Sequence, residues 1–454
     1  MRVTSFPSAT RVSFAMLALS LGIVACSDDS PDPTRPFDAS ISPRYGKAPS
    51  GPVVTSANPA ASKRDTTIDV QVIGSGFAAG SRVDFLLGGS IDSKIRTNST
   101  RYVSATELVA NITIDATAVV DYRDVAVTTL AGKKGIGTEA FAILNGGEIT
   151  VAGVTGLLTR DVSSSGIIVG FGTGTSGCGN RGYVWSETTG GMALPLPAGY
   201  CASIGDAVSE SGVIIGPVAK QSSPYELARW TPNGSGSWNV EIIGRPVSNS
   251  TWLTTHGVND VGSISSSWKN ADGTLDLWYW KQSTGWVRLA RPAGSTFCEL
   301  ERMNNHDEMV GYCHTSSGSG IYWAGPTAPA SQLPSPQGGL AGNAYMISES
   351  GIIRGASTIG GVGHMVLWIP DGSGSWSIQD LGTMSVADRN EQGSILVTNT
   401  PRAQYTPAGG SPENLGVHLN GGSLSNQSAS GTTWIAGHDD PAIAKNRHAY
   451  WFKR

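Results

Sequence analysis

The chain has 454 residues, a formal net charge of -4 and no long block of basic or acidic residues. This balance excludes the strongly basic surface typical of nucleic-acid-binding proteins, and the length allows two or more domains. Glycine is frequent (59 residues), charged residues make up only 15%, and 13 Trp outnumber 9 Phe. Many glycines between short apolar runs predict an all-β protein with tight turns.

The first 25 residues predict an export signal. Arg2 and Arg11 precede an apolar run at residues 12–25, which fits a signal-peptide core and is short for a membrane span. The run ends in IVAC at residues 23–26, and this tetrapeptide resembles the lipobox of bacterial lipoproteins. The resemblance implies cleavage after residue 25 and a lipid anchor on Cys26, at the outer membrane or cell surface. The alternative is an ordinary secretory signal with an incidental cysteine.

Residues 26–50 are rich in Pro, Ser and Asp and nearly free of aliphatic side chains. Such a segment cannot bury enough apolar surface to offset the entropy of ordering it. We therefore expect a flexible tether.

Residues 51–146 predict a small β-sandwich, because short alternating runs are separated by turn residues. The expected strands cover Thr67–Ile73, Val83–Leu86, Leu108–Ile114, Asp124–Thr129 and Ala140–Leu144.

Three short motifs in this segment are similar to those of the IPT/TIG domain: Asn58-Pro59, a Val-x-Gly-x-Gly-Phe run ending at Phe77, and Gly80-x-x-Val83. This resemblance implies an immunoglobulin-like module without catalytic residues. It would act as a spacer or as an interaction domain.

Residues 147–454 contain an internal repeat. A turn signature such as Val-Ser-Glu-Ser-Gly, followed by a short apolar run, recurs along this region. The signature ends at Gly166, Gly212, Gly262, Asp307, Gly351 and Gly393, and a degraded copy closes at Gly437. We expect the Ser or Asn side chain to cap each turn and the Gly to supply a positive φ, which Asp307 tolerates better than most residues.

An aromatic residue recurs in the same units, in seven copies of about 44 residues each. The series is Trp185, Trp230, Trp280, Trp323, Trp368, Tyr405 and Trp451. Each copy reads as four short strands, which is one propeller blade, and we expect the indoles to pack between blades rather than to stack on a ligand. The segment 148–158 is expected to supply the missing last strand and so close the ring.

The repeats also resemble the HAF repeat of bacterial extracellular proteins. The run His448-Ala-Tyr-Trp451 is the nearest copy, and the runs ending at Trp185 and Trp368 keep only the apolar and aromatic pattern. The resemblance implies export and a propeller-like β fold, and it implies no chemistry. The predicted fold class is therefore all-β, with an immunoglobulin-like sandwich (51–146) followed by a seven-bladed β-propeller (147–454).

Four cysteines remain beyond Cys26, and an even number in an exported chain predicts disulfides. We expect Cys298 to pair with Cys313 across a hairpin, and Cys178 with Cys201 in the loops that join the first two blades, although two other connectivities stay open. No close Cys-x-x-Cys spacing indicates zinc, and we expect no metal or cofactor.

The sequence lacks the common catalytic motifs, including Gly-x-Ser-x-Gly, His-Glu-x-x-His and a phosphate loop. One constellation predicts a site. Five residues lie six positions before the turn Gly or before Asp307, so on a propeller they approach the central channel: Arg160, Asp206, His256, Glu301 and Tyr345. They would bind a polar ligand or, as a weaker hypothesis, hydrolyse one. The alternative is a set of mutually satisfied ion pairs.

We therefore expect a non-enzymatic cell-envelope lipoprotein, monomeric, whose propeller binds or scaffolds a protein or glycan. The membrane would be contacted through the lipid on Cys26, and nucleic acid is not an expected partner. An enzyme acting on polysaccharide, with its site at the channel mouth, is the alternative. A purely structural envelope component is the third hypothesis.

Overall fold

The computed structural model describes residues 51–454, except 176–177, 222, 251, 316–317, 337–338, 384–387, 391, 399, 401, 426–427 and 440–447. The described part is all-β: it contains strands, turns and loops and no helix. It therefore offers no helix long and apolar enough to cross a membrane. The predicted signal peptide, Cys26 and tether lie outside the described residues.

The first two sheets of the described chain enclose one core. One sheet has the order β1-β3-β7-β6 and the other β2-β9-β8-β4-β5. Their bounds are β1 (Val53–Asn58), β2 (Ala61–Lys63), β3 (Thr66–Ser75), β4 (Arg82–Leu87), β5 (Ser90–Ile91), β6 (Ile95–Ser104), β7 (Glu107–Ile114), β8 (Tyr122–Thr128) and β9 (Lys134–Leu144). All five strands predicted here are present.

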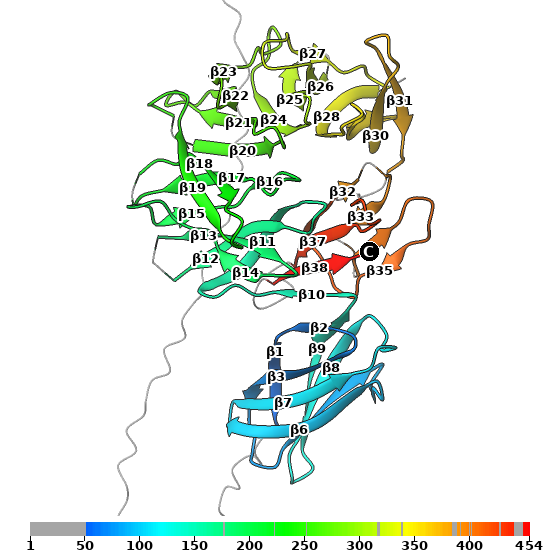
Figure 1. Cartoon of the computed structure of the whole chain (residues 1–454). Coiled ribbons are helices and arrows are strands. Elements are labelled where there is room, and N and C mark those ends of the chain that lie inside the picture. Colours follow the sequence, from blue (N-terminus) through cyan, green and yellow to red (C-terminus); the bar gives the residue numbers. More distant parts are fainter. Residues whose placement is uncertain are drawn as a thin grey trace, which may run out of the picture. The chain divides into compact units, whose positions relative to one another are not determined.

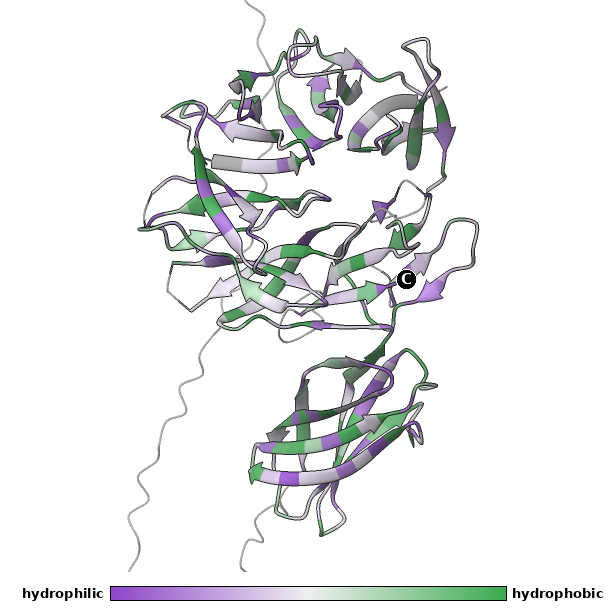
Figure 2. Ribbon diagram, viewed as in Figure 1, coloured by the Kyte–Doolittle hydropathy of each residue, from purple (hydrophilic) through white to green (hydrophobic). Residues whose placement is uncertain are grey.

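The alternation of apolar and polar residues along the strands explains this core. Val70 and Val72 of β3 are fully buried, while Phe85 of β4 meets Phe141 of β9 edge-to-face with ring centroids 5.1 Å apart. The strand β6 was not predicted. Most of its residues are hydrophilic (Figure 2). Most of its side chains are exposed and it lies at the edge of its sheet, so it carries no apolar alternation.

The remaining described chain folds into successive antiparallel meanders of about four strands, each named here by its first strand (Figure 1). The first three are β11 (Val154–Val162), β12 (Ile168–Gly174), β13 (Asn180–Ser186), β14 (Gly190–Ala193); β15 (Ala202–Ser203), β16 (Ala207–Val208), β17 (Ile214–Ala219), β18 (Glu226–Pro232), β19 (Trp238–Gly244); and β20 (Trp252–Val258), β21 (Ile264–Lys269), β22 (Leu275–Lys281), β23 (Gly285–Arg288).

The later meanders complete the chain. They are β24 (Cys298–Met303), β25 (Met309–Thr315), β26 (Gly318–Trp323), β27 (Ser331–Gln332); β28 (Gly339–Ile347), β29 (Ile353–Ile359), β30 (Val362–Pro370), β31 (Trp376–Asp380); β32 (Asp388–Arg389), β33 (Ile395–Val397), β34 (Gln404–Thr406), β35 (Glu413–Asn414); and β36 (Gly421–Leu424), β37 (Trp434–His438), β38 (Ala449–Lys453). The β24 and β28 meanders share one bridge, Gly318 to Ala341, and so form a single eight-stranded sheet.

The strand β10 (Gly146–Ile149) joins the last meander. It pairs antiparallel with β38, from Gly146 opposite Phe452 to Ile149 opposite Ala449. The predicted pairing of the two ends of this region is confirmed, but its extent is corrected: only Glu148 and Ile149 of the segment 148–158 belong to the closing strand. A turn follows at residue 153, and Val154 already begins β11.

The turn between the first and second strands of each meander has the predicted chemistry. The side-chain oxygen of residue 163, 209, 259, 304, 348, 390 or 428 accepts a hydrogen bond from the backbone N–H four residues later. Gly166 has φ 82° and Asp307 has φ 61°, so Asp307 occupies the left-handed position that Gly fills elsewhere.

The recurring indoles pack between meanders, as predicted. Trp230, Trp323 and Trp368 are fully buried, and each indole N–H donates to a carbonyl oxygen more than 30 residues earlier, in the loop of the preceding meander. Trp185 and Trp280 are also buried, whereas Trp451 is partly exposed. The buried clusters combine residues of neighbouring meanders, so the cores lie between sheets.

The first strands of the meanders contact one another in series. β11 contacts β16, β16 contacts β20, β20 contacts β24, β24 contacts β28, and β36 contacts both β32 and β11. An ion pair from Arg354 to Asp388 joins the β28 and β32 meanders. Figure 1 shows β11, β16, β20, β24 and β28 grouped around a common centre. The series therefore returns to its start.

Candidate ligand-binding site

Four of the five predicted channel residues occupy irregularities of the first strand. The pairing of the first with the second strand shifts register at Arg160, His256, Glu301 and Tyr345, so each is left without a partner in its ladder. Asp206 lies in the break between β15 and β16. A bulge residue leaves the in-out alternation of its strand, and bulges are frequent next to binding sites because they redirect side chains. The same distortion of the first strand thus recurs at the same distance from each turn.

These five residues line a single cavity of about 530 Å³. The described lining comes from all seven meanders, since Asp388 of the β32 meander and Ser423 of the β36 meander also contribute. A smaller cavity of about 140 Å³ lies toward the turns and shares His256, Arg302 and Met346 with the larger one. The larger volume is typical of small-molecule pockets.

Arg160 is held by two neighbours. Its Nε lies 3.5 Å from Oδ1 of Asp206, and its guanidinium carbon lies 5.1 Å from the centre of the Phe171 ring. The side chain is 51% exposed, and within the described chain its two terminal nitrogens have no hydrogen-bond partner. Thr255 donates its hydroxyl to the other oxygen of Asp206. Burial raises the pKa of Asp206, and the Arg160 charge opposes that rise.

His256 is buried and its Nε2 has no hydrogen-bond partner among the described residues, although it lines the cavity. Burial, with the nearby Arg302 charge, lowers the pKa of His256 to about 3, so the ring is neutral at physiological pH. A buried polar atom without a partner costs about 1–3 kcal/mol. His256 therefore needs a partner beyond the described residues.

Glu301 is the second group with unused hydrogen-bonding capacity. Its carboxylate makes no hydrogen bond or ion pair with any described residue. Burial raises the pKa of Glu301 to about 7; Arg302 opposes the rise and Glu299 adds to it. Glu299 itself lines the cavity and accepts a 2.6 Å hydrogen bond from the Tyr312 hydroxyl.

Two other arginines of the cavity are paired, as the alternative interpretation expected. Arg354 donates to Asp388 at 2.8 Å, and both side chains are more than nine-tenths buried. Arg302 donates to the carbonyl oxygen of His256 at 2.6 Å and lies 3.8 Å from Asp161. The cavity thus combines satisfied ion pairs with a free guanidinium edge, a free imidazole nitrogen and a free carboxylate.

Sequence reasoning missed several lining residues. Asp388 and Arg302 lie five rather than six positions before the turn residue, and Glu299 lies two positions before Glu301. The first two could have been found by allowing the distance to the turn to vary by one residue, and Glu299 by the two-residue period of a strand. Phe171 and Arg354 belong to second strands, where the turn spacing gives no signal.

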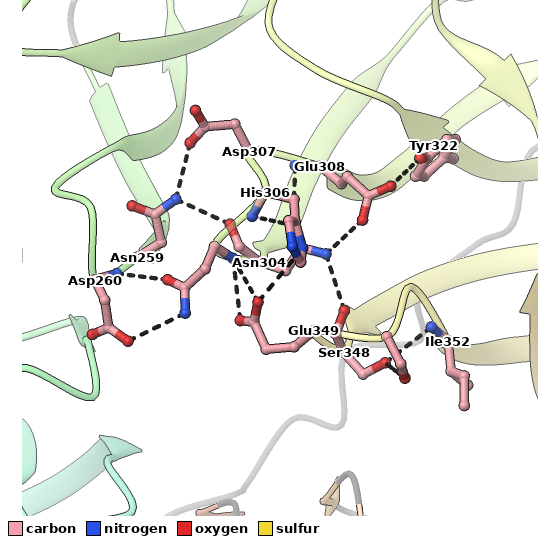
Figure 3. Close-up of polar contacts among 12 residues, drawn as sticks. Asn259, Asp260, Asn304, His306, Asp307, Glu308, Tyr322, Ser348, Glu349 and Ile352 are labelled. Carbon is pink, nitrogen blue, oxygen red and sulfur yellow. Dashed lines mark hydrogen bonds and ion pairs between the residues drawn. The ribbon is translucent and has the colours of Figure 1, made fainter.

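The turns of the β20, β24 and β28 meanders form a linked row (Figure 3), and several of their residues line the smaller cavity. The Asn259 side chain donates to the Asn304 carbonyl, and Asn304 donates to the Ser348 carbonyl, both at 3.0 Å. The backbone N–H of Asp260 donates to the Asn305 side chain, and that of Asn305 donates to Glu349. These bonds fix the spacing of neighbouring first strands and hence of the bulge residues.

Both predicted disulfides are present. Cys298 and Cys313 face each other in the register of β24 and β25, and both are fully buried. Cys178 pairs with Cys201 across the loops of the first two meanders. Cys298 directly precedes Glu299, so the disulfide between Cys298 and Cys313 anchors the strand that carries Glu299 and Glu301. In the described residues, no group of three or more His, Cys, Asp or Glu side chains is arranged to hold a metal ion.

No protein-family model and no curated protein matches the chain. Among solved structures, the chain is similar to AofleA from Arthrobotrys oligospora, at 11% identity over 63% of this chain and 81% of that one, with a TM-score of 0.34. A fucose-specific lectin from Aleuria aurantia matches at 14% identity over 57% and 91%, with a TM-score of 0.29. A structure from work on two prolyl endopeptidases matches at 10% identity over 86% and 55%, with a TM-score of 0.36. These weak likenesses assign neither ligand nor activity to this chain.

Proposed function

We propose that residues 147–454 are a seven-bladed β-propeller and that residues 51–146 are an immunoglobulin-like spacer of the IPT/TIG kind. Support for the propeller comes from the serial contacts of first strands, the cores between meanders and the pairing of β10 with β38. Support for the spacer comes from the two sheets that share one core.

The chain is proposed to act outside the cytoplasm, attached by a lipid on Cys26 and held away from the membrane by the tether 26–50. The two disulfides support an oxidising compartment, because such bonds rarely persist in a reducing cytosol. The IVAC run at residues 23–26 is the reason to expect the lipid.

The function that the geometry supports best is non-catalytic binding of a polar ligand in the cavity. The ligand is a small molecule or the end of a glycan or peptide chain. One observation carries this proposal: the buried His256 Nε2, without a partner in the described chain, lines a cavity that also contains the unpaired Glu301 carboxylate. A bound ligand would satisfy both groups, which otherwise cost stability.

Capture from envelope extracts and from glycan and peptide libraries tests the proposal. The immobilised full chain is compared with the isosteric double variant Asp206→Asn/Glu301→Gln. The control Asp69→Asn/Glu107→Gln removes the same charge from the β1-β3-β7-β6 sheet, where Asp69 is exposed and Glu107 is partly exposed. We expect a ligand that is retained by the wild type and the control and is lost by the cavity variant. Equal capture by all three would reject the cavity as the site.

Catalysis on a polysaccharide is the second candidate, favoured by one observation. Glu301, with a pKa raised to about 7, shares the cavity with Glu299. A protonated acid beside a second carboxylate is the arrangement used for glycosidic bond cleavage. If the chain releases reducing ends from a panel of polysaccharides and Glu301→Gln abolishes this release, hydrolysis replaces non-catalytic binding as the proposed function. Absence of turnover on a ligand that binds would retain the binding proposal.

A further inference from the structure

The β11 side of the cavity presents an anion-binding group. Arg160 is oriented by Asp206 and by the Phe171 ring, and its terminal nitrogens are unoccupied within the described chain. A guanidinium fixed through its Nε and its face leaves the outer edge free. That edge carries two parallel N–H groups and matches a carboxylate in a bidentate pair.

The β24 side of the cavity has the opposite character. Glu299 and Glu301 both line it, and no described cation pairs with either carboxylate. The adjacent Arg302 is engaged by the His256 carbonyl and by Asp161. Over the whole lining, three arginines stand against four carboxyl groups, and two of the four, Glu299 and Glu301, lie on this side.

The order of contacts between first strands places the β11 side and the β24 side of the cavity, called here its two poles, on strands that are not neighbours. From β11 to β24 it passes β16 and β20 in one direction, and β36, β32 and β28 in the other. In a ring of such strands, the first and fourth members lie across the centre from each other. A ligand that fills the cavity therefore meets Arg160 at one end and the two glutamates at the other.

We propose that the cavity binds a zwitterionic ligand, with its carboxylate on Arg160 and its ammonium group on Glu301 and Glu299; this rests on the binding function proposed above. The neutral His256 Nε2 takes a further polar group of the same ligand. A dicarboxylate would place a negative charge against the glutamates, and a diamine would place a positive charge against Arg160. An uncharged polyol would offer no opposite charge to Arg160 or to the glutamates. Amino acids and the termini of short peptides belong to the class that fits.

Calorimetric titration of the full chain tests this inference. The probes are ω-amino acids from glycine to ε-aminocaproate, with dicarboxylates, diamines and diols of matched length. We expect one ω-amino acid to bind more tightly than its three matched probes. Glu301→Gln should weaken it by roughly 30-fold or more, as expected when one partner of a buried charge pair is removed. Arg160→Gln should weaken it less, by roughly 5-fold, because the Arg160 side chain is 51% exposed and water screens its ion pair. The control Arg82→Gln, on an exposed arginine of β4, should leave binding unchanged.

The outcomes separate the two proposals. Tighter binding of a diol, dicarboxylate or diamine overturns the zwitterion inference, and so does unchanged binding of the ω-amino acid to Arg160→Gln. If the probe that binds is still bound more weakly by the Asp206→Asn/Glu301→Gln variant, the cavity remains the site. Absence of binding by every probe also overturns the inference, and the capture experiment then decides the binding function alone. Melting temperatures of all variants, measured alongside, exclude unfolding as the cause of a loss.

Discussion

Gly166 packs directly against the indole ring of Trp434, so closely that a Cβ atom at residue 166 would overlap the ring. Gly166 lies in the turn of the β11 meander and Trp434 in β37 of the last one, so their contact lies where the ends of the repeat region meet. Trp185 and Trp451 stack beside them with ring centroids 4.9 Å apart. This junction depends on the missing side chain at residue 166.

The variant Gly166→Ala should therefore lose about 3 kcal/mol or more of unfolding free energy, from backbone strain at φ 82° plus overlap with Trp434. Gly262→Ala is the matched control. It has φ 81° in the equivalent turn, and its nearest neighbour is 3.9 Å away, so only the strain of about 1–2 kcal/mol applies. Urea denaturation of both variants measures the difference, and equal losses would contradict the packing assigned to this junction.

Stability should depend on pH through Glu301. Because burial raises its folded-state pKa from 4.5 to about 7, the folded chain binds this proton more tightly than the unfolded chain. The stabilisation is complete below about pH 4.5 and is lost as pH rises through 7. Glu301→Gln should thus be more stable than wild type by about 1–3 kcal/mol at pH 8 and nearly equal to it at pH 5.

Denaturation at both pH values checks this prediction, with the exposed Asp69→Asn as control. The neighbours of Glu301 do not mimic the effect. His256 has a pKa lowered to about 3, and burial raises the pKa of Tyr312 and of Tyr345. A Glu301→Gln variant that is less stable than wild type at pH 8 would show that the carboxylate has a stabilising partner.

The two disulfides should differ in accessibility. Cys298 and Cys313 are fully buried, whereas Cys178 and Cys201 are partly exposed, so a thiol reductant should open the latter pair first. Alkylation followed by mass spectrometry gives the order. Replacing Cys298 and Cys313 by Ala should cost about 3 kcal/mol for a closed loop of 15 residues. Simultaneous reduction of both bonds in the folded chain would contradict their assigned burial.

The turn cap of the β24 meander offers a graded test. Asn304 accepts hydrogen bonds from the N–H groups of His306 and Glu308 and donates to the Ser348 carbonyl of the next turn (Figure 3). Asn304→Ala should cost about 2–3 kcal/mol, because buried backbone groups lose their partners. Asn304→Ser should cost about half as much, because Ser caps the equivalent turns at residues 163 and 348. Equal losses for Ala and Ser would indicate that the cap contributes nothing.

Features tied to a fixed spacing could be predicted from the sequence. The turn caps, the buried indoles and the disulfide from Cys298 to Cys313 follow from local chemistry that each copy repeats. The meeting of Arg160, His256 and Glu301 in one cavity follows in the same way, because each stands at the same distance from its turn. Whether these residues bind a ligand remains a prediction.

Features that depend on neighbouring strands could not be predicted in this way. Phe171 and Arg354 reach the cavity from second strands, and Asp388 reaches it from a position one residue nearer its turn than the predicted spacing. The polar edge strand β6 has no apolar alternation to reveal it. The extent of the closing strand depends on a turn near residue 153, where Gly153 has φ 72° and ends the apolar segment.

The central claim is that a ligand occupies the cavity between Arg160 and Glu301. A crystal structure of the chain with the retained ligand is its most direct test. We predict density in the cavity, with a carboxylate on the Arg160 guanidinium and a polar atom within hydrogen-bonding distance of His256 Nε2. Ligand density on an outer surface, with the cavity holding only water, would contradict the account.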